Sequence, residues 1–562
     1  MSFQCKKLIL FYLFFFHHFF ELLSGELTVK VAVVHFQPTC HDIENNVARL
    51  SSLAIEAGKN EAKIVVFPEL ATSGYSYFSR HEIQKVAESI PGKTTAIFSK
   101  IARKYEMYIV LGLPEYSLLT NQFYNSAVLI DPDGLIQGVY RKHSHLIESS
   151  WSSLGNGRVP IFETPYGKLA ILICADINYP ELFVQATLKD ATFLILPTNG
   201  GVNEDLIRAR AMEGNCHIIL ANRYGNELEE YLNIESTECF NEETLQIIPP
   251  FYYDFQDGKS VIVKANGIID LVLEKPLDWI GYSELPLEIS KNSIVKRPEL
   301  YSLLGQNTLN SYVIKCMRLP EPTSFAMSTA SLKVNNTEEA LKEIKDTLVK
   351  LQAYRNNLSC KLVVFPADVL NLKPAEIDQF INSLRSLTKQ TNVDIVLGLR
   401  ALADNCPMSF LITKEGKSYC YKRLHRLESE NIQTGDHFFV IDRDYARLAL
   451  LQDKDLLISE TTRVLAKMGV DLVAVSANMD DANIKTFAKV RSLDYLHIAM
   501  SNLNGSNGIY LGGFLTYPSF KEDNFMTIMQ VDTTHVRKKK ELKTGCDLEL
   551  LLKHKIEPLH AS

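Results

Sequence analysis

With 562 residues, the chain is too long for one ordinary hydrophobic core, so we expect at least two domains. Hydrophobic residues make up 46% and charged residues 22%, as in soluble globular proteins. The net charge of −7 argues against a nucleic-acid partner, which would require a basic surface. The ten cysteines form no CxxC pair and no Cys/His cluster at metal spacing, so neither a disulfide framework nor a metal site is predicted.

The first 26 residues differ in composition from the rest of the chain. Lys6-Lys7 precedes the apolar run Leu8–Phe16, a pattern typical of a secretory signal. This run is too short for a comfortable membrane span. An upstream extension of a cytoplasmic protein fits equally well, so export and a cytoplasmic location both stay open.

From Val29 onward, strand and helix patterns alternate. Val29–Phe36 alternates apolar and polar residues as a strand does, and Asp42–Asn60 has helical spacing with Asp42 as N-cap. Ala62–Phe67 and Met107–Leu113 are apolar runs typical of strands that are buried on both faces. His81–Tyr105 is mostly helical, with a break at Pro91-Gly92.

The rest of this half continues the alternation. Strands are predicted in a hairpin around Asp131–Gly134 and at three further segments, Gly167–Ile173, Ala191–Pro197 and His217–Asn222. Helices are predicted between them at Tyr179–Lys189 and Glu204–Asn215. Such alternation indicates a layered α/β domain, which we place at residues 27–301.

The second half weakly repeats the first. Ile64–Glu69 resembles Leu362–Ala367, and Ile109–Leu113 resembles Ile395–Leu399. Two later pairs of segments follow in the same order. We therefore expect a linker at 302–322, a second α/β domain at 323–540 and a C-terminal tail at 541–562.

Three residues of the first half stand where predicted strands end. Taken singly, Glu69 would be a surface carboxylate, Lys142 a solvated charge and Cys174 a buried thiol. The carboxyl ends of such strands gather at one edge, where ligands and catalytic groups commonly lie. Together, the three residues suit nucleophilic attack by a thiol on a carbonyl carbon.

A thiol must lose its proton before it attacks a carbonyl carbon. A carboxylate can accept that proton as general base and return one to the leaving amine. An ammonium and the backbone N–H after the nucleophile can stabilise the oxyanion. The helix that we expect to begin beside Cys174 would favour the thiolate.

These segments resemble the nitrilase superfamily of carbon–nitrogen hydrolases, with its Glu-Lys-Cys triad. The resemblance covers roughly Val29 to Tyr301, on these motifs: Phe67-Pro68-Glu69, Gly74-Tyr75, Tyr140-Arg141-Lys142, Glu148-Ser149, Cys174-Ala175-Asp176, Tyr179-Pro180-Glu181, Asn199, Arg210, Met212-Glu213, Asn222-Arg223, and Gly258-Lys259-Ser260 with Gly267. It implies a four-layer αββα sandwich, a thioester on Cys174, a lysine held by Glu148, and no metal or organic cofactor. It also implies a substrate and oxyanion site formed by Tyr75, Ala175 and Asn199.

Two features depart from the family pattern. Members that act on particular substrates often carry a bulky residue after the cysteine, and here Ala175 gives no guide to the substrate. The segment Asn226–Tyr253 is longer and more acidic than usual. It is either a lid over the pocket or a surface insertion, and we favour the insertion.

The second half resembles the same family more faintly and has lost the triad. Ala367 stands for Glu69 and Asp453 for Cys174, while Arg423, or Lys422 after a one-residue slip, stands for Lys142. Glu428 matches Glu148, again seven residues before a glycine. We expect a pseudo-catalytic domain that pairs with the first as an internal pseudo-dimer, in preference to a new binding site. One active site per chain follows.

The function predicted from the sequence is that of an amidase. Its substrate would be a small carboxamide, ω-amide or N-carbamoyl compound. A nitrilase, an N-acyltransferase that uses the same thioester, and a non-enzymatic binding protein remain as alternatives. Further homo-oligomerisation stays open.

Overall fold

A computed structural model describes residues 27–144, 147–227, 258–289, 294–305, 321–353, 359–403, 405–479, 483–512, 520–523 and 525–537. The signal-like segment, the C-terminal tail, most of the linker and the Asn226–Tyr253 segment beyond Glu227 lie outside the described residues, and so do the predictions made for them. In the described part, no helix is long and apolar enough to cross a membrane.

The first half contains two sheets that pack face to face. The first sheet has the order β12 (Trp279–Pro286), β1 (Thr28–His35), β2 (Ile64–Val66), β3 (Tyr108–Ser117), β4 (Gln122–Ile130), β5 (Ile136–Arg141). The second has the order β11 (Ile269–Leu273), β10 (Ser260–Val263), β9 (His217–Asn222), β8 (Phe193–Thr198), β7 (Gly167–Ile171), β6 (Ile161–Thr164). Side chains of both sheets form one buried cluster between them. The predicted hairpin β4–β5 is confirmed, and β10–β11 forms another antiparallel pair.

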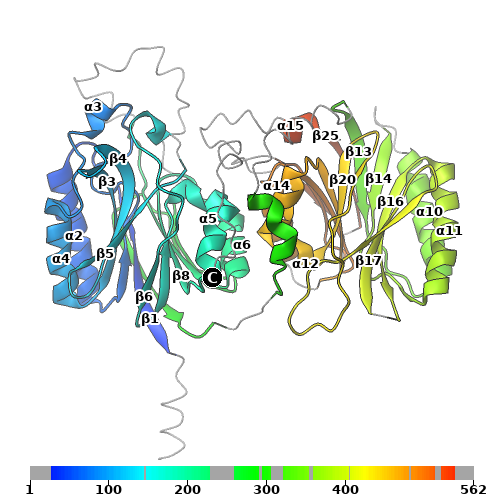
Figure 1. Cartoon of the computed structure of the whole chain (residues 1–562), viewed down its shortest axis with the longest axis horizontal. Helices are drawn as coiled ribbons and strands as arrows, with labels where there is room; N and C mark the ends of the chain where they lie inside the picture. Colours follow the sequence, from blue (N-terminus) through cyan, green and yellow to red (C-terminus); the bar gives the residue numbers. More distant parts are fainter. Residues whose placement is uncertain are drawn as a thin grey trace, which may run out of the picture.

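Helices cover the outer faces of both sheets (Figure 1). On the first sheet lie α2 (Ile43–Lys59) and α4 (Lys93–Tyr105), with the short α3 (Arg80–Ile83) between them in the chain. Helix α2 begins as predicted, because the Asp42 side chain accepts a hydrogen bond from the backbone of Asn45. On the second sheet lie α5 (Pro180–Thr187) and α6 (Glu204–Gly214). This is the predicted αββα sandwich.

The second half repeats this strand order. One sheet has the order β18 (Ser418–Lys422), β17 (Cys406–Ile412), β16 (Asp394–Ala401), β14 (Cys360–Val364), β13 (Ser324–Ala330), β25 (Met526–Asp532), with β15 (Asn371–Leu372) beside β16. The other has the order β19 (Val440–Asp442), β20 (Arg447–Gln452), β21 (Leu472–Ala477), β22 (His497–Asn502), β23 (Asn507–Tyr510), β24 (Phe520–Asp523). An identical order in both halves is best explained by duplication, as the weak repeat predicted.

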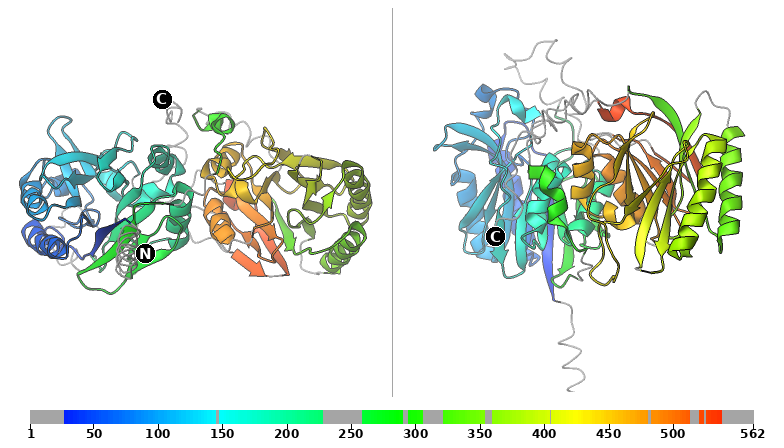
Figure 2. Two further views of the ribbon diagram at one scale, coloured as in Figure 1. Left: turned by 90° about the horizontal axis from the view of Figure 1, so that it is seen from below. Right: turned by 45° about the vertical axis from the view of Figure 1, so that its right-hand side comes forward.

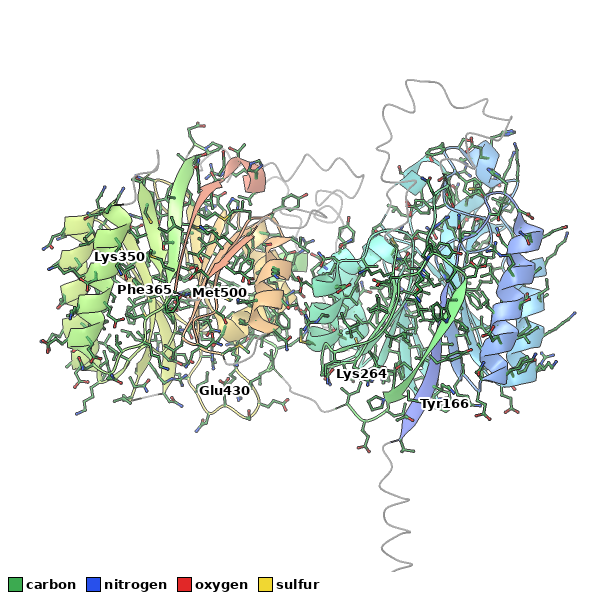
Figure 3. All side chains as sticks on the ribbon, turned by 180° about the vertical axis from the view of Figure 1, so that it is seen from behind. Tyr166, Lys264, Lys350, Phe365, Glu430 and Met500 are labelled. Carbon is green, nitrogen blue, oxygen red and sulfur yellow. The ribbon has the colours of Figure 1, made fainter. Side chains whose placement is uncertain are left out.

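The second half has the same layers of helices. Its outer helices are α10 (Thr337–Ala353) and α11 (Pro374–Thr391), and Figure 3 shows Lys350 on the outward side of α10 with Phe365 and Met500 inside the sandwich. Its other helices are α12 (Asp453–Leu456), α13 (Ser459–Lys467), α14 (Asn483–Ser492) and α15 (Thr534–Arg537). Helices α5 and α6 pack against α13 and α14, so the two sandwiches lie side by side with these helices between them (Figure 2).

The described residues between the halves contact the second half. The 3-10 helix η4 (Pro298–Gly305) packs on α13, and the Tyr301 hydroxyl lies 2.5 Å from His425 Nε2. The Lys296 ammonium forms a 3.0 Å ion pair with Glu460. The domain limits set from the sequence stay a prediction, but the chain from Ile294 to Gly305 binds the second half.

Candidate active site

Glu69 lies at the carboxyl end of β2 and is almost fully buried, with 1% of its surface exposed. Its Oε1 accepts hydrogen bonds from Lys142 Nζ (2.8 Å) and Asn125 Nδ2 (2.7 Å). Its Oε2 makes no hydrogen bond within the described part of the chain. Since buried carboxylate oxygens are normally satisfied, this oxygen is available to a proton or a substrate.

Lys142 follows β5 and is fully buried between two carboxylates. It forms ion pairs with Glu69 and Glu148. The Tyr75 hydroxyl donates to Glu148 Oε2 at 2.8 Å, and Asn125 also reaches Glu148 at 3.3 Å. The ammonium is thus fixed from several sides, and Tyr75 contacts Glu148 within this cluster.

Cys174 begins the 3-10 helix η2 (Cys174–Asn178) and is partly exposed. Its backbone has φ of 49°, a left-handed conformation that costs free energy for a residue other than glycine. The thiol donates to the backbone oxygen of Asn199 at 3.4 Å. A sharp turn of this kind presents the sulfur at the edge where β2, β7 and β8 end.

Asp176 holds this turn against the lysine loop. Its carboxylate accepts from the Tyr140 hydroxyl (2.8 Å) and from the backbone N–H groups of Ile173 (3.2 Å) and Ser144 (2.8 Å). One side chain therefore connects the strand before Cys174 with the loop after Lys142. The spacing between nucleophile and ammonium depends on it.

The charges of the cluster set its protonation. Burial raises the pKa of the Cys174 thiol well above its usual range, and the negative Glu69 adds to this, while Lys142 opposes it. The short η2 helix does not reverse the effect, so the predicted preference for thiolate is wrong for the unliganded site. Burial, with repulsion from Glu148, also raises the pKa of Glu69 above its ordinary value.

Lys142 keeps its proton. Burial alone would lower its pKa, but Glu148 and Glu69 outweigh this and hold the pKa well above its usual range. The site therefore combines a protonated thiol, a basic carboxylate and a permanent cation.

The remaining predicted site residues lie around the cysteine. The Asn199 side-chain amide is buried, and neither its oxygen nor its nitrogen has a hydrogen-bond partner in the described part. Ala175 is buried in the turn itself. No group of three potential metal-ligating side chains occurs among the described residues.

Sequence reasoning missed two supporting residues. Asn125 joins Glu69 and Glu148, and Glu227 accepts from the backbone of Tyr75 (3.0 Å) and Ser76 (2.9 Å) while pairing with Arg223. Neither has a local sequence signal, because each acts on segments far away in the chain. The Asn222-Arg223 motif pointed to the neighbourhood of Glu227 without assigning it a role.

The corresponding edge of the second half carries different groups. Tyr421 donates to Asp455 (2.7 Å) as Tyr140 does to Asp176, so the residue two places later, Arg423, occupies the lysine position and the slip to Lys422 is wrong. Arg423 pairs with Asp453 (3.4 Å) and with Glu430 (2.8 Å). Glu428, matched from spacing to Glu148, is exposed instead.

The model of the carbon-nitrogen hydrolase family matches residues 30–269. A nitrilase of Pyrococcus abyssi is 35% identical over 269 residues, covering 47% of this chain and 92% of the relative. A citrullinase of Francisella tularensis is 33% identical, covering 36% of this chain and 76% of the relative. Omega-amidase NIT2 of Danio rerio is 31% identical, covering 34% and 72%.

These matches and the layered fold show that the protein is an enzyme that hydrolyses carbon–nitrogen bonds. The chain belongs to the carbon–nitrogen hydrolase family of the nitrilase superfamily.

Proposed function

We propose that this hydrolase is an amidase that acts on a small carboxamide, ω-amide or N-carbamoyl substrate through a thioester on Cys174. One observation carries the proposal. The thiol of half-buried Cys174 shares an edge with a carboxylate that has one oxygen without a hydrogen bond in the described part of the chain, and with an ammonium that two carboxylates fix.

In the first step, Glu69 accepts the Cys174 proton as the sulfur attacks the carbonyl carbon. The raised pKa of Glu69 makes its carboxylate a stronger base than that of an exposed glutamate, which suits it to this transfer. The Lys142 ammonium and the backbone N–H of Ala175 stabilise the oxyanion. The C–N bond then breaks, and Glu69 returns the proton to the leaving ammonia or amine.

In the second step, Glu69 accepts a proton from water, and the hydroxide attacks the thioester carbon. The carbon–sulfur bond breaks, the acid leaves, and Cys174 recovers its proton. Asn199, whose buried amide has no hydrogen-bond partner among the described residues, can donate to a substrate oxygen or accept from a substrate amide. The overall reaction consumes one water and needs no redox partner.

The choice of an amide rests on the chemistry of the site and on the relatives. Two of the relatives are named a citrullinase and an omega-amidase. Nitrilase activity is the second candidate, because the relative from Pyrococcus abyssi is named a nitrilase. The two differ in the substrate, since a nitrilase forms acid and ammonia from a nitrile with two waters and an amidase forms them from a carboxamide with one.

For the second half we propose a non-catalytic role. Ala367 cannot accept a proton, and the Asp453 carboxylate cannot form a thioester. Asp453 is instead bound by Arg423 and by the backbone N–H groups of Lys454 (2.7 Å) and Asn478 (3.0 Å).

A panel of amides, ureides and nitriles tests the proposal, with ammonia release and intact mass followed together. We expect acid product from at least one amide or ureide, and an acyl adduct that Cys174→Ser abolishes. Acid from nitriles alone would replace the amidase proposal by the nitrilase. Turnover that survives Cys174→Ser would overturn both.

A further inference from the structure

An arginine of helix α6 binds the backbone of the turn that carries Cys174. Arg210 of α6 donates from Nε to the backbone oxygen of Ile177 (3.2 Å), three residues after the cysteine. Arg210 is itself 2% exposed and donates to Glu213 at 3.0 Å. Because a non-glycine residue keeps positive φ only where its surroundings enforce it, these contacts matter for the position of Cys174.

Glu213 is also bound by the second half of the chain. Its Oε1 accepts from the backbone N–H of Ser459 at 2.6 Å, and its Oε2 forms a 3.2 Å ion pair with Arg491. An unbroken series of contacts thus runs from α13 and α14 through Glu213 and Arg210 to the Cys174 turn.

The duplication supplies an internal comparison, because the second half has the same arginine. Arg491 donates to the backbone oxygen of Leu456 (2.8 Å), three residues after Asp453. Asp494 stands three residues after Arg491, as Glu213 does after Arg210. However, Asp494 is bound by Thr462 (2.7 Å) and Arg463 (3.3 Å) of its own half.

The chemical reason for this asymmetry lies at the start of two helices. Pro180 begins α5, and Ser459 begins α13 at the equivalent place, six residues after Cys174 and Asp453 respectively. Proline has no N–H, so α5 cannot make the reciprocal bond to Asp494. The second half therefore holds the turn of the active half, without the reverse contact.

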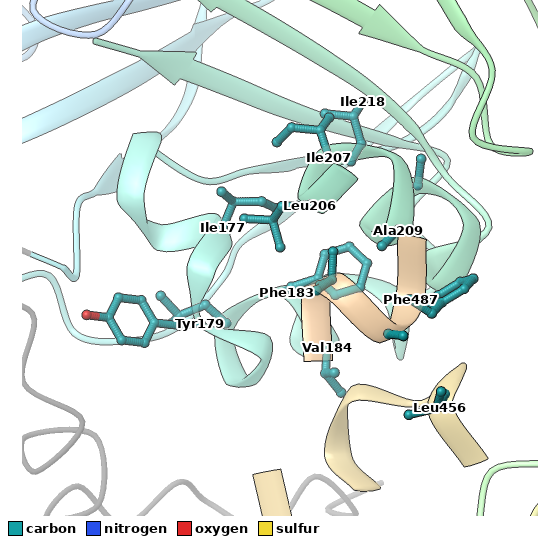
Figure 4. Packing of buried hydrophobic residues seen from close by; sticks show 14 of the residues in the cluster. Ile177, Tyr179, Phe183, Val184, Leu206, Ile207, Ala209, Ile218, Leu456 and Phe487 are labelled. Atoms are coloured by element: carbon teal, nitrogen blue, oxygen red, sulfur yellow. The ribbon is translucent and has the colours of Figure 1, made fainter. Parts of the chain in front are cut away.

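In a second contact, too, the second half donates to the first half without an equivalent contact in return. Arg463 of α13 forms a bidentate pair with Glu181 in the first turn of α5, with distances of 2.8 and 3.1 Å. The equivalent of Arg463 in the first half is Val184, and Figure 4 shows it among the apolar residues of this interface, with Leu456 and Phe487. Both half-to-half charge contacts near the cysteine thus depend on donors of the second half.

We infer that the second half is a built-in positioning partner for the nucleophile, and that the Ser459 N–H and Arg491 act on Cys174 through Glu213 and Arg210. This inference rests on the proposed role of Cys174. It assigns the non-catalytic half a function in the reaction, although it contributes no catalytic residue.

Ser459→Pro provides a sharp test in the full-length protein. It removes the N–H together with the hydroxyl and places proline where α5 already has it. Ile458 before it is extended (φ −110°, ψ 116°), as a residue before proline prefers. Ser459→Ala is the matched control, because it loses the same hydroxyl and keeps the N–H.

Two readouts are measured: kcat and KM on the best substrate, and the rate at which iodoacetamide alkylates Cys174 at several pH values. A hydrogen bond to a charged acceptor is worth roughly tenfold or more in an equilibrium, so we expect Ser459→Pro to lower kcat and alkylation about fivefold. KM should stay near that of the Ser459→Ala control. Alkylation of buried Cys40 reports unfolding separately.

Glu213→Gln is the second variant in case Ser459→Pro does not fold. It keeps the shape of the side chain and weakens the contacts of Glu213 with Ser459, Arg491 and Arg210. We expect kcat and the alkylation rate to fall by a similar factor. Folded Ser459→Pro or Glu213→Gln protein with the kcat and alkylation rate of Ser459→Ala would overturn the inference. Failure of the proposed function is distinguishable, since turnover would then survive Cys174→Ser.

Discussion

In both halves, a buried tyrosine on an edge strand donates to an aspartate two residues after the nucleophile position. The distances are 2.8 Å from Tyr140 to Asp176 and 2.7 Å from Tyr421 to Asp455. Around this shared anchor the chemistry differs. The first half has Glu69, Lys142 and a left-handed Cys174, whereas Asp453 begins an α-helix and is not among the described residues with positive φ.

The two halves differ in a way that separates residues needed for the fold at this edge of the sandwich from residues needed for the reaction. The tyrosine–aspartate anchor fixes the loop after the edge strand and is needed in either half for the fold. The left-handed backbone of Cys174 and the unbonded buried oxygen of Glu69 cost stability, and among the described residues neither Asp453 nor Ala367 has an equivalent. We therefore expect substitutions at equivalent positions to have different effects.

The largest effect is expected for Glu69→Ala, which gives the first half the residue that Ala367 provides in the second. Loss of the general base should lower kcat/KM by about a thousandfold, measured by ammonia release. Glu430→Ala, which removes a carboxylate beside Arg423, is the control and should leave kcat/KM unchanged. A Glu69→Ala enzyme with near-normal activity would remove the proposed base.

The second prediction makes the same change in both halves. An asparagine at 176 or 455 would turn one of its acceptor oxygens into a donor that faces hydroxyl or N–H groups. Asp176→Asn should displace Lys142 relative to Cys174 and lower kcat about a hundredfold. Asp455→Asn should leave kcat unchanged and lower the free energy of unfolding by about 3 kcal/mol, because it takes the charged acceptor away from the buried hydrogen bonds of His425 and Tyr421. Equal loss of kcat in both variants would mean that the anchor serves only the fold.

These residues also show how far the sequence could predict the site. Glu69 and Cys174 stood out because each follows a strand whose apolar pattern is strong, and parallel strands end at one edge. Lys142 follows the hairpin strand β5, whose pattern is mixed, so its assignment depended on the family resemblance. The duplicated order of the strands was predictable because matching apolar runs occur in the same order in both halves.

Other features depended on contacts that spacing does not encode. Asn125 reaches Glu69 across 56 residues of chain, and Glu227 reaches Tyr75 across 152. Counting back from Gly435 chose Glu428, but the loop turns so that Glu430 meets Arg423. The thiolate expectation was wrong because it considered the helix and omitted the burial and the Glu69 charge, which dominate.

The third prediction concerns pH and uses Asn125, whose counterpart in the second half is Pro407, as shown by the bonds to Lys142 and Arg423. The Asn125 amide lowers the pKa of Glu69 against the larger raising effects of burial and Glu148. Without that donor the pKa rises further, so the base ionises at higher pH. Asn125→Leu should move the ascending limb of kcat/KM against pH upward and lower kcat/KM at neutral pH about tenfold. A limb that stays in place would show that another group of the coupled cluster sets it.

The smallest effect is expected from returning a thiol to the second half. Asp453→Cys in a Cys174→Ala background should leave the enzyme inactive and without an acyl adduct, because Ala367 supplies no base and Arg423 loses one of its two carboxylate partners. Adding Ala367→Glu supplies a carboxylate, but Pro407 offers no donor to orient it, and the backbone at 453 starts an ordinary helix. Detectable turnover by Asp453→Cys alone would contradict the division of labour between the halves. An adduct that forms without turnover would place the missing function in thioester hydrolysis, and intact-mass measurement during incubation with substrate distinguishes the two results.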